Sequence, residues 1–383
     1  MKALKIVGIA LGVLVLLAVG GLAYVVYKAR HLEDSHDLQA QVDEVARRAV
    51  EEGGIPALAV VVEKDGQRYF QTYGTAEPLP GRDAVYEIGS VTKLFTALTA
   101  QSLVHAGTLT WDDHVADLLP PEHRPAQDDG TTLAHLASHT SGLPRLSPTF
   151  LQSIVDTCDP YAALTRDTVF AHYARQEGKS APGGDAEYSN WGMGLLGHLL
   201  ELASDTGYED LVRQHLLRPL AMHSTFIAER PGEDPPAYVE GHDEEGRPTC
   251  PWEFGALQGA GAFHSTITDM ARFLHAAIDA SPVPGIDWEA SFRKRAAYAG
   301  NAMGVCLGWH LDTFTGLLFG MPRILWHNGG TGGFSSYLGL SPERHIGVVV
   351  LANKGGANAV VDKLGVDILM RANHISFARE GDR

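Results

Sequence analysis

The chain has 383 residues, of which 45% are hydrophobic and 20% are charged, as in an ordinary globular protein. This length is enough for one large domain or two, each with its own core. Acidic residues outnumber basic ones, 46 against 30, and give a formal net charge of −16 at pH 7. This charge argues against a nucleic-acid backbone as the partner, so we expect no nucleic-acid binding.

The first thirty residues differ from the rest of the chain. Lys2 and Lys5 precede an uninterrupted apolar run at positions 6–27, which two further basic residues follow. The run is long enough to span a bilayer, and it is longer than the apolar core of most cleaved signal peptides. We favour an uncleaved anchor over residues 1–30, with a cleaved signal as the alternative. The charge bias favours a single-pass protein of the cell membrane, with the rest of the chain on the periplasmic or extracellular side.

Strand patterns occur at both ends of the remaining chain, with short helical patterns between them. An amphipathic helix at 36–52 precedes a hairpin of strands at 57–63 and 67–73, and later strands are expected at 304–311, 324–327, 336–340 and 345–352, before a closing helix at 357–372. These patterns predict an α/β fold of the α+β type, an antiparallel sheet flanked by helices and built from both chain ends. The sheet domain would comprise residues 31–111 and 255–383, and residues 112–254 would form an all-helical insertion.

Ser90 and Lys93 stand three residues apart at the start of a predicted helix, with Leu94 and Leu98 on its buried face. The positive end of a helix favours an alkoxide and disfavours an ammonium, so Lys93 can serve as a neutral base for a nucleophilic Ser90. The alternative is a helix-capping serine beside a surface lysine. A second Ser-x-x-Lys at 291–294 lacks the apolar helix, and we expect it to be a solvated surface.

Two other segments carry candidate site residues. Tyr188-Ser189-Asn190 follows a Pro-Gly loop; Tyr188 can pass a proton to a leaving nitrogen, and Asn190 can hold a substrate amide. The alternative is a tyrosine and a capping asparagine at a helix start. The second segment, 326–334, ends a strand at His327 and opens into glycines that let a substrate lie close to the backbone; its alternative is a tight hairpin corner.

Cysteine and histidine spacing offers little support for a metal or a disulfide framework. The three cysteines, Cys158, Cys250 and Cys306, leave at least one unpaired within the chain and permit one bridge. His135 and His139 are four residues apart but lack the glutamate of a zinc-protease helix between them. We therefore expect no metal site and no cofactor.

The ordered segments resemble the penicillin-recognising serine hydrolases, specifically the class C β-lactamase-like family. The resemblance rests on Ser-x-x-Lys at 90–93, His-Thr-Ser-Gly-Leu-Pro at 139–144, Tyr-x-Asn at 188–190, His-x-Gly at 327–329 and Ala-Asn-Lys at 352–354. It covers nearly everything after the apolar run. An α/β-hydrolase esterase is set aside, because the chain contains no Gly-x-Ser-x-Gly.

The resemblance implies an acyl-enzyme mechanism in which Ser90 attacks a carbonyl while Lys93 and Tyr188 move protons. It also implies an oxyanion hole made by the backbone N–H groups of Ser90 and Gly330. Substrate contacts would come from five positions: Asn190, His327, Asn328, Gly329 and Asn358. The expected partners are a small-molecule or cell-wall peptide substrate, and the membrane through the N-terminal helix.

His327 stands where β-lactamases of this family have lysine, and His-x-Gly versions occur among its D-alanyl peptidases and esterases. Three functions remain open: hydrolysis of an amide of β-lactam or D-alanyl-peptide type, hydrolysis of an ester by the same residues, and a penicillin-binding receptor without turnover. A histidine of ordinary pKa is mostly neutral near pH 7. We therefore predict that activity on carboxylate-bearing substrates rises as His327 protonates and that His327→Lys flattens this dependence.

Overall fold

The computed structural model describes residues 37–154, 159–176, 178–227, 237–298, 300, 303–318 and 320–377. The predicted anchor over residues 1–30 lies outside these residues. Within the described ranges, no helix combines the length and the apolar character needed to cross a bilayer.

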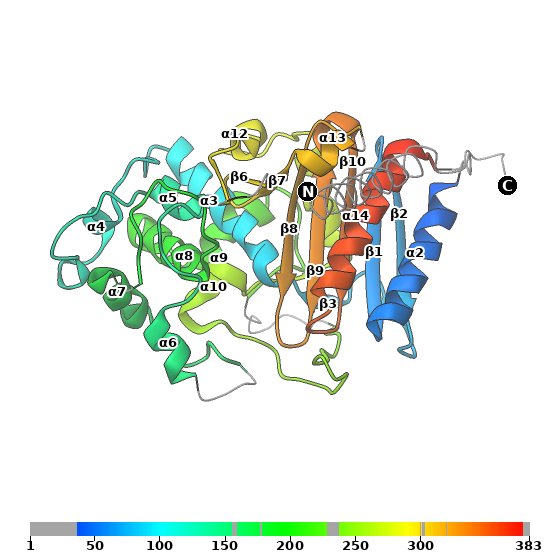
Figure 1. Cartoon of the computed structure of the whole chain (residues 1–383), viewed down its shortest axis with the longest axis horizontal. Coiled ribbons are helices and arrows are strands. Elements are labelled where there is room, and N and C mark those ends of the chain that lie inside the picture. The colour runs from blue at the N-terminus through cyan, green and yellow to red at the C-terminus, as the bar shows by residue number, and fades with distance from the viewer. Residues whose placement is uncertain are drawn as a thin grey trace, which may run out of the picture.

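An eight-stranded antiparallel sheet joins the two ends of the chain (Figure 1). Its strand order is β2-β1-β10-β9-β8-β7-β6-β5, so the first hairpin pairs directly with the last strand. The strands are β1 (Ala57–Lys64), β2 (Gln67–Gly74), β5 (Ala296–Ala297), β6 (Gly304–Val305), β7 (His310–Asp312), β8 (Ile324–Gly330), β9 (Ser335–Ser341) and β10 (Ile346–Ala352). A separate pair, β3 (Val85–Glu87) and β4 (His264–Thr266), lies at the entrance to the Ser90 segment. The predicted fold is confirmed.

Helices cover both faces of the sheet. On one face, α2 (Leu38–Gly53) and α14 (Asn358–His374) share an apolar cluster with the sheet; on the other, α3 (Thr92–His105) and α11 (Ile267–Ile278) do so. The central strands β1 and β10 are valine-rich because both of their faces are buried. Asp37 caps α2 by accepting from the Gln39 N–H at 3.0 Å, and Gly54 ends it in the left-handed conformation.

The helical part of the chain lies to one side of the sheet, on the left in Figure 1. Its helices are α4 (Val115–Leu118), α5 (Leu133–Ala137), α6 (Pro148–Ser153), α7 (Arg166–Arg175), α8 (Asn190–Ser204), α9 (Tyr208–Val212) and α10 (Gln258–Gly261). They enclose a second apolar cluster, and α3 contributes to both clusters, with Leu94 and Leu98 in the first and Ala97 and Ala100 in the second. The division into a sheet domain and an insertion at 112–254 stays a prediction.

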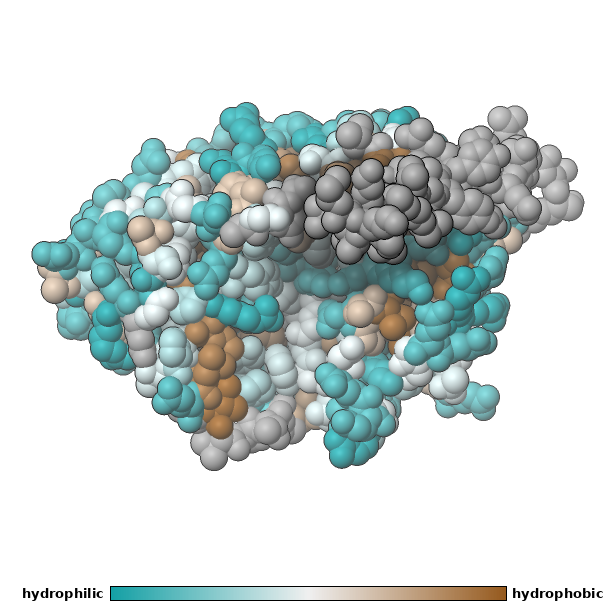
Figure 2. Space-filling view, viewed as in Figure 1, coloured by the Kyte–Doolittle hydropathy of each residue, from teal (hydrophilic) through white to brown (hydrophobic). Residues whose placement is uncertain are grey.

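Hydrophilic residues cover most of the face shown in Figure 2, with a hydrophobic patch in the region of α6. Leu151 of α6 is one of the exposed large hydrophobic side chains.

Two local expectations were wrong. The segment 304–311 is not one strand: β6 and β7 are separate strands joined by a turn in which Gly308 has a φ of +74°. The second Ser-x-x-Lys is not a solvated surface throughout, because Ser291 is fully buried on α12 (Trp288–Phe292) and its hydroxyl donates to the Trp288 carbonyl at 2.7 Å. Trp288 and Phe292 anchor this short helix in the core, a tertiary effect that the basic local sequence did not indicate.

The bridge that the cysteine count left open is present. Cys250 is disulfide-bonded, and Cys306 is a free thiol buried in the core. Burial raises the pKa of the Cys306 thiol to about 12, so it has no thiolate character at neutral pH.

Candidate active site

Ser90 lies on a tight turn between β3 and α3. The turn Gly89–Val91 is a single 3₁₀ turn, and Gly89 has a φ of +50° that favours glycine. A Cβ on Gly89 would lie only 2.7 Å from the Gly330 nitrogen, so the backbones of the two segments are in close contact. This arrangement places Ser90 at the N-terminal end of α3, as the sequence predicted.

The Lys93 amine is held against Ser90 in a buried position. Lys93 Nζ lies 2.9 Å from Ser90 Oγ and donates to the Ala260 carbonyl at 2.5 Å. Burial of the side chain holds the Lys93 pKa well below its ordinary value, and the nearby Arg145 guanidinium lowers it further. A neutral amine at this position can accept the Ser90 proton. The alternative of a solvated surface lysine does not fit this burial.

Tyr188 reaches the same place from the loop before α8. Ser189, not Asn190, caps this helix by accepting from the Gly192 N–H at 2.8 Å. The Tyr188 ring centroid lies 4.8 Å from Lys93 Nζ. Burial raises the pKa of the Tyr188 phenol, while a hydrogen bond with Ser90 and the Arg145 guanidinium lower it by less. Tyr188 is therefore a neutral phenol in the free protein, and of the two groups Lys93 is the better candidate for a base.

Three buried histidines surround the Tyr188 ring. The ring centroid of His139 lies 4.7 Å from that of Tyr188, and those of His310 and His327 lie 6.0 Å from it. The pKa of each histidine is lowered, above all by burial, and that of His310 falls to about 4. All three are neutral near pH 7 and add no positive charge to the site.

His327 does not fit the cation role expected for it. Its Nδ1 lies 2.6 Å from the Asn328 carbonyl, so Nδ1 carries the proton, and Nε2 has no hydrogen-bond partner among the described residues. Because burial holds its pKa well below 6.5, protonation requires more acidic solution than the sequence suggested. The predicted rise of activity with His327 protonation therefore moves out of the neutral range.

The end of β8 packs tightly against the Ser90 turn. A Cβ on Gly329 would lie 2.1 Å from the Ile88 carbonyl oxygen and 2.9 Å from the Ser90 nitrogen. The Ser336 hydroxyl also donates to the Ile88 carbonyl, at 2.8 Å. Gly330 follows directly, so the backbone nitrogens of Ser90 and Gly330 come from adjoining segments, as an oxyanion hole requires.

Three asparagines were also predicted to contact the substrate, and their side chains have different surroundings. Asn190 is buried, and its Oδ1 has no partner among the described residues, which leaves an acceptor available. Asn328 Nδ2 donates to Asp362 of α14 at 2.7 Å; because alternate strand residues face opposite sides, its side chain points away from the side of His327. Asn358 Nδ2 donates to the Gly329 carbonyl at 2.7 Å, so this amide holds the glycine segment.

Arg145 was missed by the sequence analysis. Its guanidinium carbon lies 5.1 Å from the Tyr188 ring centroid, and its side chain is exposed. It lies close enough to lower the pKa values of Lys93, His139 and Tyr188. Its place directly after the His-Thr-Ser-Gly-Leu-Pro segment was the signal available in the sequence. Arg145 therefore brings a guanidinium beside the Tyr188 ring.

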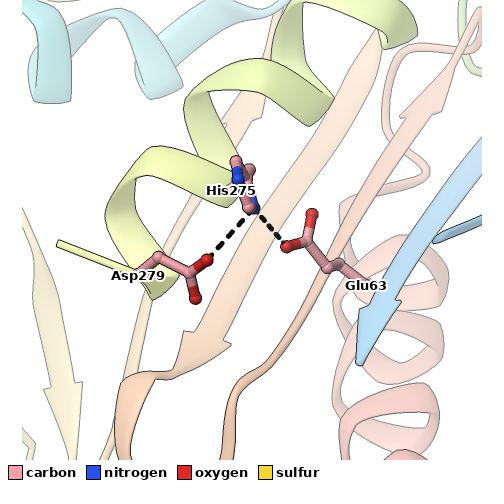
Figure 3. Close-up of side chains that lie close together, drawn as sticks. All are labelled: Glu63, His275 and Asp279. Atoms are coloured by element: carbon pink, nitrogen blue, oxygen red, sulfur yellow. Dashed lines mark hydrogen bonds and ion pairs between the residues drawn. The ribbon is translucent and has the colours of Figure 1, made fainter. Parts of the chain in front are cut away.

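One histidine and carboxylate cluster in the described part of the chain has the spacing of a metal site, and it lies on β1 and α11. Figure 3 shows His275 pointing toward Glu63 and Asp279, with Nδ1 at 2.6 Å and 3.6 Å from their carboxylate oxygens. The other Glu63 oxygen accepts from Arg68 at 2.6 Å. One imidazole nitrogen makes both contacts, and an arginine shares the glutamate, so these side chains already use one another's polar atoms.

The comparisons with known proteins agree with the geometry. The family model described as Beta-lactamase matches residues 42–369. The D-alanyl-D-alanine-carboxypeptidase/endopeptidase AmpH of Escherichia coli is 29% identical over 82% of this chain and 83% of its own. A protein named Beta-lactamase from Yersinia enterocolitica is 30% identical over 84% of this chain and 88% of its own.

Two solved structures share the fold. A class C beta-lactamase superposes with a TM-score of 0.74 at 21% identity, over 87% of this chain and 95% of its own. The octameric penicillin-binding protein homologue from Pyrococcus abyssi superposes with a TM-score of 0.72 at 26% identity, over 87% of this chain and 76% of its own.

Proposed function

Because the chain belongs to the beta-lactamase family of serine hydrolases, we propose that Ser90 forms an acyl-enzyme with an amide of β-lactam or D-alanyl-peptide type. The observation that carries the proposal is the buried Lys93 amine, 2.9 Å from Ser90 Oγ, with a pKa held well below its ordinary value. The names of the AmpH and Beta-lactamase relatives support the substrate class.

The proposed reaction has two halves. Ser90 Oγ attacks the carbonyl carbon while Lys93 takes its proton, and the oxyanion lies between the N–H groups of Ser90 and Gly330. The neutral Tyr188 phenol protonates the leaving nitrogen as the C–N bond breaks, and the Lys93 ammonium restores the Tyr188 proton. Water then attacks the ester at Ser90 and releases the carboxylic acid and the free hydroxyl.

Substrate recognition would use the groups around this centre. The buried Asn190 Oδ1, which has no partner among the described residues, is an acceptor for a substrate N–H group. Since His327 is neutral, the Arg145 guanidinium beside the Tyr188 ring is the cation that we assign to a substrate carboxylate. Asn358 and Gly329 keep the glycine segment in place beside Ser90.

We also assign the protein to the cell envelope. The apolar run at 6–27 would anchor the chain in the cell membrane as a single pass, with the catalytic part on the periplasmic or extracellular side, within reach of cell-wall peptides.

Labelling of the full-length chain with a fluorescent penicillin tests the proposal, with Ser90→Ala as the matched control and intact mass followed over time. We expect a covalent adduct that requires Ser90. Rapid loss of the adduct identifies a β-lactamase, and slow loss identifies a peptidase. An adduct that never turns over, with no activity on D-alanyl peptides, identifies a receptor. Equal labelling of Ser90→Ala would overturn the assignment of the nucleophile.

An esterase is the second candidate, favoured by one observation. His327 replaces the lysine of the β-lactamases and is buried and neutral, so this position offers no charge to a substrate carboxylate. Neutral short acyl esters need no such charge. Turnover of these esters together with no labelling by penicillin would support the esterase.

A further inference from the structure

A cavity of about 750 Å³ lies next to the Ser90 turn, and neither Ser90, Lys93 nor Tyr188 lines it. Its walls come from the β3–β4 pair, the segment 238–241, the segment 249–253, α10 and Phe334. This volume is within the range of small-molecule sites. The cavity is therefore large enough for a ligand of its own.

Glu87 is the polar centre of this cavity. The side chain is 4% exposed; Oε1 accepts from the Trp252 N–H at 3.1 Å, and Oε2 has no hydrogen-bond partner among the described residues. Burial raises the pKa of this carboxyl to about 7. The neighbouring Thr331 hydroxyl and the Trp252 N–H lower the pKa by less. A buried carboxylate with an open oxygen is costly unless a cation or a donor meets it.

The residue opposite Glu87 does not supply that cation. His264 is its cross-strand partner and also lines the cavity. Burial lowers the pKa of His264 to about 4, so the ring is neutral at pH 7, and its Nδ1 has no partner among the described residues. Glu87 and His264 thus face the cavity with two unused polar atoms and no positive charge.

The rest of the lining fits a cation with an apolar stem. Glu240 and Glu253 add two more carboxylates, and no lysine or arginine occurs among the described residues of the wall. Trp252, Phe334 and Val239 provide the apolar and aromatic surface. Aromatic faces attract organic ammonium groups, and the methylene stem of an amine packs on such a surface.

We propose that this cavity binds a primary alkylammonium group, with the ammonium on Glu87 and the alkyl stem against Trp252 and Phe334. The site is separate from the acylation centre and goes beyond the proposed hydrolase function. Its ligand class is an amine-bearing molecule or side chain.

The test compares two probes of the same shape, hexylammonium and hexanol, by calorimetry on the full-length Ser90→Ala chain at pH 8, where Glu87 is mostly ionised and the amine is protonated. We expect hexylammonium to bind at least ten-fold more tightly than hexanol. Glu87→Gln keeps the shape of the side chain and should remove at least nine-tenths of that preference. Glu122→Gln, an exposed carboxylate outside the cavity, should change nothing.

Equal binding of the two probes would overturn the proposal, and so would an unchanged preference in a folded Glu87→Gln. The two-probe comparison needs no Glu87 variant, so it decides the matter even if that variant fails to fold. The binding comparison involves no acylation and uses a variant without the Ser90 hydroxyl, so its result is independent of the penicillin-labelling test.

Discussion

Gly329→Ala is the substitution whose effect follows most directly from the geometry. The new Cβ would lie 2.1 Å from the Ile88 oxygen and 2.9 Å from the Ser90 nitrogen. A carbon and a carbonyl oxygen approach to roughly 3.3 Å, so the end of β8 and the Ser90 turn must separate by about 1 Å. A displacement of about 1 Å at a reacting centre costs about a hundred-fold in rate. Overpacking of this kind costs about 1–3 kcal/mol of stability.

The assay is the second-order rate of acylation by a fluorescent penicillin, with the melting temperature measured in parallel. We expect the rate to fall about a hundred-fold or more, while the variant still melts cooperatively. Gly81→Ala is the matched control, because a Cβ there meets nothing within 4 Å and the residue is exposed. A folded Gly329→Ala that acylates at the wild-type rate would refute the packing of β8 against Ser90.

Three other predictions concern residues of the candidate site and its surroundings. The His310 pKa is about 6.5 in the unfolded chain and about 4 in the folded one, so the unfolded state binds more protons between these pH values. Urea unfolding should therefore show that wild type loses about 2 kcal/mol of stability from pH 7.5 to 5 relative to His310→Phe. Parallel stability curves for the two proteins would contradict this. Arg145→Gln should lower kcat/KM about ten- to a hundred-fold for carboxylate-bearing substrates and much less for neutral esters. Arg145→Lys should recover part of the loss. Equal losses for both kinds of substrate would refute the proposal that Arg145 binds a substrate carboxylate. Asn358→Ala should slow acylation about five-fold for every substrate, because the Gly329 carbonyl loses its donor; a loss confined to carboxylate-bearing substrates would instead support direct contact.

The sequence predicted the elements whose patterns are local. The hairpin of β1 and β2, the apolar β10 and the helix after Ser90 each carry their own periodicity, and the motif order predicted which segments meet. What it missed depends on packing. Ser291 is buried because α12 is anchored by its two aromatic residues, although its immediate neighbours are basic.

The candidate site shows the same limit. Proximity of Lys93 to Ser90 follows from helical spacing, but the burial that lowers its pKa does not. The lowered pKa of His327 has the same origin, since its burial, and the two other buried histidines beside Tyr188, become visible only in the fold. The pairing of Glu87 with His264 joins positions 177 residues apart, a contact that no local motif reports.

The sheet that joins the two chain ends has a consequence for protein engineering. The Leu38 N–H donates to the Ser376 carbonyl at 2.9 Å, so the first and last described elements meet. A short linker could close residues 37–377 into a ring, and new ends could be opened at the exposed Asp65-Gly66 turn, outside the Ser90 segment. Such a circular permutant would keep every strand pairing and lose only the covalent link between β1 and β2. It would also separate the part of the chain that carries Ser90 from the N-terminal apolar run.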